Sequence, residues 1–514
     1  MDHANDNFAL QLAGAAASHP HRDCLIPDPQ RPAAGVWSYA DLDHWAQRMG
    51  GALHELGVAP GDRVVVQVDK SPLAVALYLG CLRIGAVYVP LNTAYTAAEV
   101  EYFLTDAEPR LFVCTPAARE RAGARAEGAG AAVSTLGADD AGELVDAARR
   151  AQPYTGVAQR AAGDLAAIVY TSGTTGRAKG AMLSHGNLAA GTRVLMEAWG
   201  WRDDDVLLHA LPIFHVHGLF VALHCALLGG SPMIFLQRFD AAWVAAALPH
   251  ATVMMGVPTF YTRLLEQGEV NREHCRGVRL FISGSAPLTE QTFAAWEERT
   301  GHRILERYGM SETMMLTSNP LAGERVPGTV GFPLPGVDLR IAGDSGEPLD
   351  PGDVGVIEVR GPNVFSGYWR MPEKTAEEFR ADGFFVTGDL GVRDAEGRVA
   401  IVGRAKDLVI SGGYNVYPKE VERLLDELPG VAESAVIGVP HKDFGEAVVA
   451  VLETAGTAIS EAQVGRALAD RLARFKQPKA VVCVDELPRN AMGKVQKNEL
   501  RARYADLFDG PAAD

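Results

Sequence analysis

The sequence has few cysteines and no excess of basic charge. Its 514 residues include six cysteines, which are Cys24, Cys81, Cys114, Cys225, Cys275 and Cys483. No Cys-x-x-Cys pair or Cys/His metal spacing occurs among them, so we expect reduced thiols rather than a disulfide framework or a zinc module. The formal net charge of −16 argues against nucleic-acid binding, which needs a basic face.

Long hydrophobic runs are missing as well. No apolar run approaches the ~20 residues that a membrane-spanning helix requires. The N-terminal MDHANDNFAL has two aspartates where a signal peptide has basic and apolar residues. We therefore expect a cytoplasmic protein without membrane insertion. The composition is that of a globular protein, 47% hydrophobic and 22% charged, and the length predicts about two to four domains.

Short apolar runs alternate with helical patterns in the first half of the chain. Residues 62–69, DRVVVQVD, predict a strand, and residues 71–86 predict a helix that Ser71 can cap, with Pro72 in its first turn. The runs AVYVPL and RLFVCT predict further buried strands. Residues 120–163 are rich in Ala, Gly and Arg and predict a pair of surface helices. This rhythm is typical of α/β layers with parallel strands.

The pattern changes twice towards the C-terminus. After Pro335 the runs GVDLRIAG, GVIEVRG and GRVAIVG predict short strands joined by Gly-rich turns. Beyond GRAKDLVISGG, at 403–413, two helical patterns surround the strand-like VAESAVIGVP. We therefore predict a large N-terminal domain at 1–403 and a small α+β domain at 404–514.

Residues 170–180, YTSGTTGRAKG, combine hydroxyl groups and glycines with two cations. Glycines let backbone N–H groups approach phosphate oxygens, hydroxyls add donors, and cations offset the charge. The residues that supply these groups are Thr171, Ser172, Gly173, Thr174, Thr175, Gly176 and Lys179. The nucleoside-triphosphatase pattern G-x-x-x-x-G-K-[ST] is not met, because Gly180 follows Lys179. The run predicts a polyphosphate-binding loop of another type.

Six further motifs follow this loop in order. They are LPIFHVHG at 211–218, ISGSAPL at 282–288, RYGMSET at 307–313, FFVTGDL at 384–390, GRAKDLVISGGYNVYPKEVE at 403–422 and LPRNAMGKVQK at 487–497. Together the motifs resemble those of the adenylate-forming superfamily, which includes acyl-CoA synthetases, firefly luciferase and peptide-synthetase adenylation domains. The resemblance covers almost the whole chain. It implies an α/β multidomain fold, with a large N-terminal domain of two α/β layers plus a distorted β-barrel and a small mobile C-terminal domain.

The resemblance implies an acid–CoA ligase that uses ATP, Mg²⁺ and coenzyme A. A carboxylate attacks the α-phosphate of ATP, and because both reactants are anions the protein must supply cations and donors. Lys179 would hold the outer phosphates with the loop, and Lys494 would reach both the carboxylate and the α-phosphate. Glu312 would bind Mg²⁺ together with Thr174. The family usually has threonine where Ser311 stands.

Other residues of the motifs are expected to bind the nucleotide or the thiol. The nucleotide residues are Gly284, Ser285 and Ala286 with Tyr308 and Gly309 at the adenine, Asp389 at the ribose, and Arg404 at the ribose or α-phosphate. Rotation of the small domain about a hinge at Lys406 would then admit CoA along Gly412 and Gly413. His215 is expected at the mouth of the acyl pocket, with a weaker expectation for His217.

The acid is predicted by a narrower resemblance. FHVHGLF, VMMGVPTFYTRLL, RYGMSETMMLTSNP and FGEAVVAVL resemble the malonyl-CoA synthetase group. A second carboxylate must be paired when buried, and the candidates to pair it are Arg279, Ser285, His215 and Arg238. Met310 and Met315 would shorten the pocket. Methylmalonate stays open, since one methyl group is worth only ~1–3 kcal/mol of discrimination.

Three alternatives remain beside this prediction. The protein can be a ligase for another short or aromatic acid, because a single sequence shows pocket shape poorly. It can be an adenylation protein that loads a carrier, although HVHGL lacks the expected aspartate and no carrier segment follows. A non-catalytic binding protein is disfavoured by the presence of Lys179, Glu312 and Lys494. The oligomeric state and acylation of Lys494 are left open.

Overall fold

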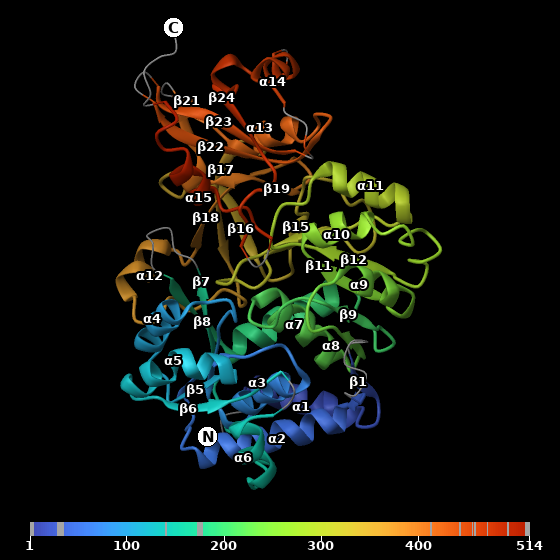
Figure 1. Cartoon of the computed structure of the whole chain (residues 1–514), viewed down its shortest axis with the longest axis vertical. Coiled ribbons are helices and arrows are strands. Elements are labelled where there is room, and N and C mark those ends of the chain that lie inside the picture. Colours follow the sequence, from blue (N-terminus) through green and yellow to red (C-terminus); the bar gives the residue numbers. More distant parts are fainter. Residues whose placement is uncertain are drawn as a thin grey trace.

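The structure is a computed structural model that describes residues 5–27, 35–138, 141–171, 178–411, 414–441, 444–454, 456, 459–469, 471–490 and 493–508. Its strands form four sheets. Two large sheets with their helices build the N-terminal part, a four-stranded sheet follows, and a five-stranded sheet lies at the C-terminal end (Figure 1). This arrangement confirms the α/β multidomain fold, while the boundary at residue 403 stays a prediction.

The first large sheet contains the strands predicted at 62–69, in AVYVPL and in RLFVCT, which appear as β3, β4 and β5. Its six strands run in the order β6-β5-β3-β4-β7-β8. Their bounds are Arg63–Gln67 (β3), Val87–Pro90 (β4), Leu111–Cys114 (β5), Ala132–Thr135 (β6), Leu165–Thr171 (β7) and Lys179–Ser184 (β8). All neighbours are parallel except β7 and β8, which are antiparallel. The parallel α/β prediction is therefore confirmed for this sheet.

The expected pair of surface helices at 120–163 is partly wrong. Helices α5 (Pro116–Gly128) and α6 (Glu143–Arg150) are present, but β6 lies between them and pairs with β5 in parallel. The strand is only four residues long and ends in small polar side chains. An edge strand this short gives too weak an alternation of apolar and polar residues to be recognised from sequence.

The second large sheet has nine strands in the order β15-β14-β13-β12-β11-β9-β10-β1-β2. Their bounds are Asp23–Pro27 (β1), Trp37–Ser38 (β2), Leu207–His209 (β9), Met233–Phe235 (β10), Val253–Gly256 (β11), Leu280–Ser283 (β12), Leu305–Tyr308 (β13), Thr317–Ser318 (β14) and Phe332–Pro333 (β15). The central strands from β1 to β13 are parallel, so the carboxyl ends of β12 and β13 lie at one edge. A single apolar cluster joins this sheet to the first one.

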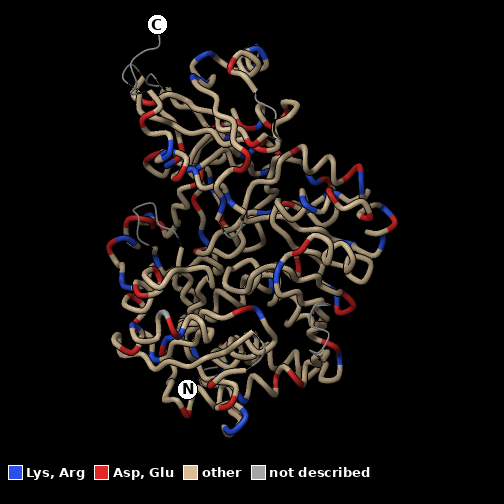
Figure 2. The backbone as a smooth tube through the Cα atoms, in the orientation of Figure 1, with Lys and Arg blue, Asp and Glu red and all other residues tan. Residues whose placement is uncertain are grey.

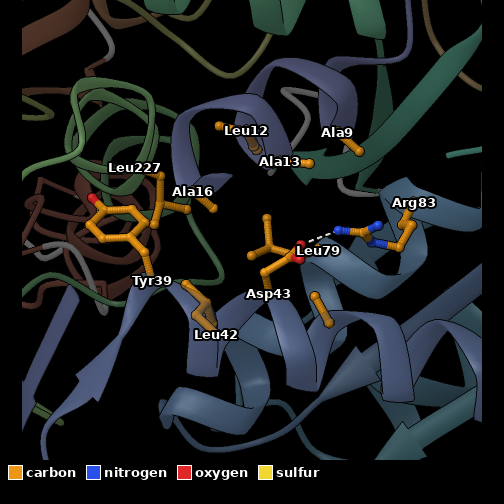
Figure 3. A pocket seen from close by; sticks show the side chains of 11 residues that line it. Ala9, Leu12, Ala13, Ala16, Tyr39, Leu42, Asp43, Leu79, Arg83 and Leu227 are labelled. Carbon is orange, nitrogen blue, oxygen red and sulfur yellow. Dashed lines mark hydrogen bonds and ion pairs between the residues drawn. The ribbon is translucent and has the colours of Figure 1, made fainter. Parts of the chain in front are cut away.

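Helices cover both sheets. They are α1 (Phe8–Ser18), α2 (Tyr39–Glu55), α3 (Pro72–Ile84), α4 (Ala97–Ala107), α7 (His185–Ala198), α8 (His224–Gly229), α9 (Ala241–Ala247), α10 (Pro258–Leu265) and α11 (Glu290–Thr300), and a π-helix at His217–Leu223 precedes α8. Helix α3 forms as expected, because the Ser71 hydroxyl accepts from the Ala74 N–H and Gly85 ends the helix at φ 76°. A surface pocket of about 20 Å³ beside the Arg83–Asp43 ion pair has room for one water (Figure 3).

The rest of the chain is rich in strands. Strands β16 (Asp338–Ala342), β17 (Val354–Arg360), β18 (Phe385–Arg393) and β19 (Val399–Arg404) form an antiparallel sheet, with α12 (Pro372–Glu378) between β17 and β18. The C-terminal part contains β20 (Val409–Ser411), β21 (Tyr414–Val416), β22 (Val431–His441), β23 (Gly445–Thr454), β24 (Ala480–Val484) and the helices α13 (Pro418–Leu425), α14 (Glu461–Leu468) and α15 (Lys497–Arg503). It has apolar clusters of its own.

Charged side chains of both signs are interspersed along the chain (Figure 2). All six cysteines are free thiols, and five of them are buried. No helix in the described part of the chain is long and apolar enough to cross a membrane.

Candidate active site

Three residues from distant motifs meet at the edge where β13 ends. The Tyr308 hydroxyl donates to Asp389 Oδ2 at 2.6 Å, and Arg404 Nε lies 3.1 Å from Asp389 Oδ1. Asp389 is buried in β18, and its charge raises the pKa of Arg404 against the effect of burial. Each carboxylate oxygen keeps a second lone pair that can accept from a ligand hydroxyl. The arrangement suits the nucleotide role expected for these residues.

A buried carboxylate lies next to this group. Burial raises the pKa of Glu312, and its Oε1 lies within hydrogen-bond distance of the hydroxyls of Tyr368, at 3.1 Å, and Thr171, at 3.4 Å. These are hard oxygen donors of the kind that Mg²⁺ prefers. The residues present therefore fit the expected metal, although its second expected ligand, Thr174, lies outside the described residues.

Lys179 begins β8 and is buried with its charge paired. Its Nζ lies 2.8 Å from Glu378 Oε1 and 4.1 Å from the centre of the Tyr368 ring. Lys179 and Glu312 therefore face the same phenol from two sides. The remaining expected loop residues, Ser172, Gly173, Thr174, Thr175 and Gly176, lie outside the described residues, as do Gly412 and Gly413.

Lys494 comes from the C-terminal part and lies close to the nucleotide residues. Burial lowers the pKa of Lys494 to about 8; the positive charge of Arg404 also lowers it, and the charge of Asp389 raises it. The segment is held against α10, because a Cβ at Gly493 would lie 2.8 Å from Thr259 Oγ1. The structure thus brings Lys494 to Asp389 from more than a hundred residues along the chain.

A second polar group is formed by His217 and Ser285, one of the residues expected at the adenine. His217, at the start of the π-helix, has its Nδ1 3.2 Å from Ser285 Oγ. Ser285 adopts φ 73°, a left-handed conformation that is strained for a residue with a Cβ. Burial lowers the pKa of His215 to about 4, so this histidine is neutral at pH 7 and offers a hydrogen bond rather than a charge.

Arg307 is a candidate site residue that the sequence analysis did not single out. It is 3% exposed, and its Nε and Nη2 have no hydrogen-bond partner within the described residues. Burial lowers its pKa to about 9, which leaves the guanidinium charged at pH 7. Gly284 makes room for it, since a Cβ there would lie 2.4 Å from Arg307 Cζ. The signal was a cation at the carboxyl end of a buried parallel strand, where α/β sheets place their ligands.

Arg279 does not support its expected role. Its Nη2 and Nε lie 2.5 and 2.7 Å from the carboxylate of Asp205, and its remaining donors reach the carbonyls of Trp199 and Gly200. It precedes β12, so it lies at the opposite end of that strand from Ser285. Its guanidinium is engaged in a framework ion pair and in two hydrogen bonds to backbone carbonyls.

The other expected residues are close to the site in different ways. Gly309 is packed so tightly that a Cβ would lie 1.9 Å from the Met314 carbonyl oxygen. Met310 is partly buried and packs on the main apolar cluster, of which Met315 is a member. Ala286 is partly buried beside Ser285, and Lys406 lies in the short turn Ala405–Asp407 between β19 and β20.

A cleft of about 830 Å³ opens between the N-terminal sheets and the C-terminal part. Its cationic lining residues are Lys70, Arg238, Arg263 and Arg489, and its aromatic ones are Tyr88, Phe214, Phe239, Trp243 and Phe260. Asn490 and Gly493, close to Lys494, line it from the C-terminal side. The exposed Arg238 therefore belongs to this cleft.

The fold and the site are those of an adenylate-forming enzyme, and the chain belongs to the AMP-binding enzyme family. That family matches residues 12–369, and the AMP-binding enzyme C-terminal domain matches residues 420–494.

Individual relatives cover nearly all of the chain. It is 53% identical to ATP-bound MatB from Rhodopseudomonas palustris, with a TM-score of 0.95 over 98% of this chain and 100% of that one. For apo MatB the identity is 54% over the same shares, and the TM-score is 0.84. The parts of this chain are therefore arranged more like those of the ATP-bound structure.

Two curated relatives are named after different acids. The malonate–CoA ligase of Arabidopsis thaliana is 37% identical over 87% of this chain and 78% of its own length. The feruloyl-CoA synthase of an Amycolatopsis species is also 37% identical, over 91% of this chain and 94% of its own length. Overall identity to these two relatives does not separate a dicarboxylic from an aromatic acid.

Proposed function

We propose that this protein is an AMP-forming malonate–CoA ligase. Malonate and ATP give malonyl-adenylate and pyrophosphate, and the thiol of coenzyme A then displaces AMP to give malonyl-CoA. The observation that carries the proposal is the buried guanidinium of Arg307, which stays charged with two donor groups unpartnered in the described structure. Such a group needs an anion, and the second carboxylate of malonate supplies one.

The first step joins two anions, so its barrier falls where cations face the developing charge. Lys494 lies beside Arg404 and Asp389, in position to hold the attacking carboxylate against the α-phosphate. Lys179 would hold the outer phosphates, whose charge grows as pyrophosphate leaves. When bound at Glu312, Mg²⁺ would neutralise charge on the phosphates.

The acid pocket would lie between Arg307, Ser285 and His217. A guanidinium can hold a carboxylate with two parallel hydrogen bonds, and the Ser285 hydroxyl and the His217 imidazole add neutral donors. A monocarboxylate would gain nothing from this group, since the guanidinium would stay unpartnered as it is in the ligand-free protein. Methylmalonate stays a secondary substrate, as one methyl group is a weak discriminator.

Coenzyme A would approach through the 830 Å³ cleft. The cleft has aromatic and aliphatic walls for pantetheine and cations for phosphate groups. If Lys494 holds the carboxylate during adenylation, it would stand in the way of the thiol, so the small domain would rotate about Lys406 before the thiol attacks. The thiol that attacks is expected to come from coenzyme A and not from the protein. Burial raises the pKa of Cys275 to about 11 and of Cys114 to about 12, so these thiols are unreactive. The absence of disulfides among the six cysteines also supports a cytoplasmic location.

The test is product formation from a panel of acids. Purified protein is incubated with ATP, Mg²⁺ and coenzyme A plus malonate, methylmalonate, acetate, butyrate, coumarate or ferulate, and thioester and AMP are quantified. We expect malonate to give the highest kcat/KM and methylmalonate to follow it. Efficient turnover of ferulate or acetate with inactive malonate would refute the proposal.

A further inference from the structure

Glu378 is the last residue of α12, and its carboxylate faces the phosphate side of the site. One oxygen, Oε1, lies 2.8 Å from Lys179 Nζ. The other, Oε2, accepts from the Tyr368 hydroxyl at 2.7 Å. Its side chain is 20% exposed, and Lys374 Nζ lies 3.3 Å away on the solvent side. Glu378 therefore links solvent-exposed α12 to the lysine that would hold the outer phosphates.

Tyr368 joins this carboxylate to the expected metal ligand. Its hydroxyl lies within hydrogen-bond distance of both Glu378 Oε2 and Glu312 Oε1, and it donates its single proton to one of them at a time. Lys179 is thus paired with the Glu378 carboxylate, lies over the face of the Tyr368 ring and is close enough for its charge to act on Glu312. In this arrangement the lysine is held in place and its charge is partly neutralised.

We propose that Glu378 is a positioning residue of the pyrophosphate subsite, which holds Lys179 when no nucleotide is bound and competes with polyphosphate for it. The inference rests on the proposed function only in assigning the outer phosphates to Lys179. Triphosphate would take hydrogen bonds from Lys179 that Glu378 now accepts. The displaced carboxylate then stands beside the phosphates and repels them.

Competition between Glu378 and the phosphates for Lys179 would speed the release of pyrophosphate. A lysine with no counter-ion would hold the released pyrophosphate as tightly as it holds the same two phosphates in ATP. Slow release of pyrophosphate would then limit turnover. A carboxylate at the same ammonium weakens both complexes and keeps Lys179 in place for the next nucleotide. Glu378 would therefore lower the affinity for anions rather than contribute to it.

The chain supplies a matched control on the same helix. Glu377 precedes Glu378 and is 65% exposed, with Lys374 Nζ at 2.9 Å as its ion-pair partner. E378Q and E377Q each remove one negative charge without changing side-chain size. Any effect of net charge or of helix stability is shared by the two variants, while only E378Q removes the negative charge that faces Lys179.

The experiment measures equilibrium binding of ATP and of inorganic pyrophosphate by calorimetry, with and without Mg²⁺ and without any acid. We expect E378Q to bind both anions at least about tenfold more tightly, because one unit charge a few ångströms away has this effect close to the limit of bulk water and a larger one in a half-buried site. E377Q should match the wild type. Steady-state assays should show a lower KM for ATP and stronger pyrophosphate inhibition in E378Q.

Two outcomes would overturn the proposal. Unchanged or weaker anion binding in E378Q would show that Glu378 does not compete for Lys179. Weaker binding only in the presence of Mg²⁺ would instead make Glu378 a metal ligand. E378A provides a second variant and must change affinity in the same direction. Because the calorimetric binding measurements need no acid, their result is independent of which acid the enzyme activates.

Discussion

Replacing Arg307 by methionine separates the two roles that the structure gives this side chain. In the ligand-free protein Arg307 is 3% exposed, with two donor nitrogens unpartnered within the described residues. Burying such groups costs about 1–3 kcal/mol, and methionine has a similar length without the charge. R307M should therefore raise the free energy of unfolding by about 1–3 kcal/mol.

The same change should weaken recognition of malonate. Leaving one carboxylate of a bound dicarboxylate unpaired in a closed pocket costs about 2–5 kcal/mol. At ~1.4 kcal/mol per tenfold, kcat/KM for malonate should fall about 30- to 4,000-fold. The value for butyrate should stay constant, because butyrate has no second carboxylate to pair with the guanidinium. Pyrophosphate release with each acid, together with urea unfolding, measures both effects.

Arg279 provides the control for this experiment. R279M leaves Asp205 buried without its closer ion-pair partner, since Arg202 Nε lies 4.0 Å away, so it should destabilise the protein by about 3–5 kcal/mol and leave the ratio of malonate to butyrate activity unchanged. Equal losses for both acids in R307M, or a changed ratio in R279M, would refute the assignment of the acid pocket.

Three further expectations concern the adenylation step. K494A should slow malonyl-adenylate formation by about 10²–10³-fold and still convert supplied malonyl-adenylate with coenzyme A; equal loss of both steps in half-reaction assays would contradict the role of Lys494. Because Lys494 is charged below its pKa of about 8 and the reaction needs the cation, kcat/KM for adenylation should fall as the pH rises through about 8. A decline that starts only near the ordinary lysine pKa would argue against the buried environment. G284A places a Cβ against Arg307, so malonate kcat/KM should fall by about 100-fold, as expected for displacement of a binding group; unchanged malonate kinetics would count against a close contact.

Local chemistry carried most of the fold prediction. The strand at 62–69 and the helix at 71–86 appear as β3 and α3, because buried apolar runs and the Ser71–Pro72 start signal act within a few residues. Strand β6 was missed because its pairing with β5, rather than any strong pattern of its own, makes it a strand. Pairing partners distant in sequence cannot be read from a local window.

The order of the motifs predicted which segments come together at the candidate site. Tyr308, Asp389 and Arg404 meet as expected, although their hydrogen bonds depend on the register of β18 against β19. Arg279 and Arg307 show what could not be predicted from the sequence. Both are basic residues next to buried strands, but one precedes β12 and the other lies near the end of β13. Only the direction of the parallel sheet tells which of them faces the ligand edge.

The central claim is that cations from two parts of the chain let malonate attack the α-phosphate of ATP. Malonate-dependent exchange of labelled pyrophosphate into ATP, measured without coenzyme A, tests this step alone. We expect exchange with malonate that is lost in K494A and in R307M. Absence of exchange with malonate, under conditions where a monocarboxylate supports it, would contradict the account.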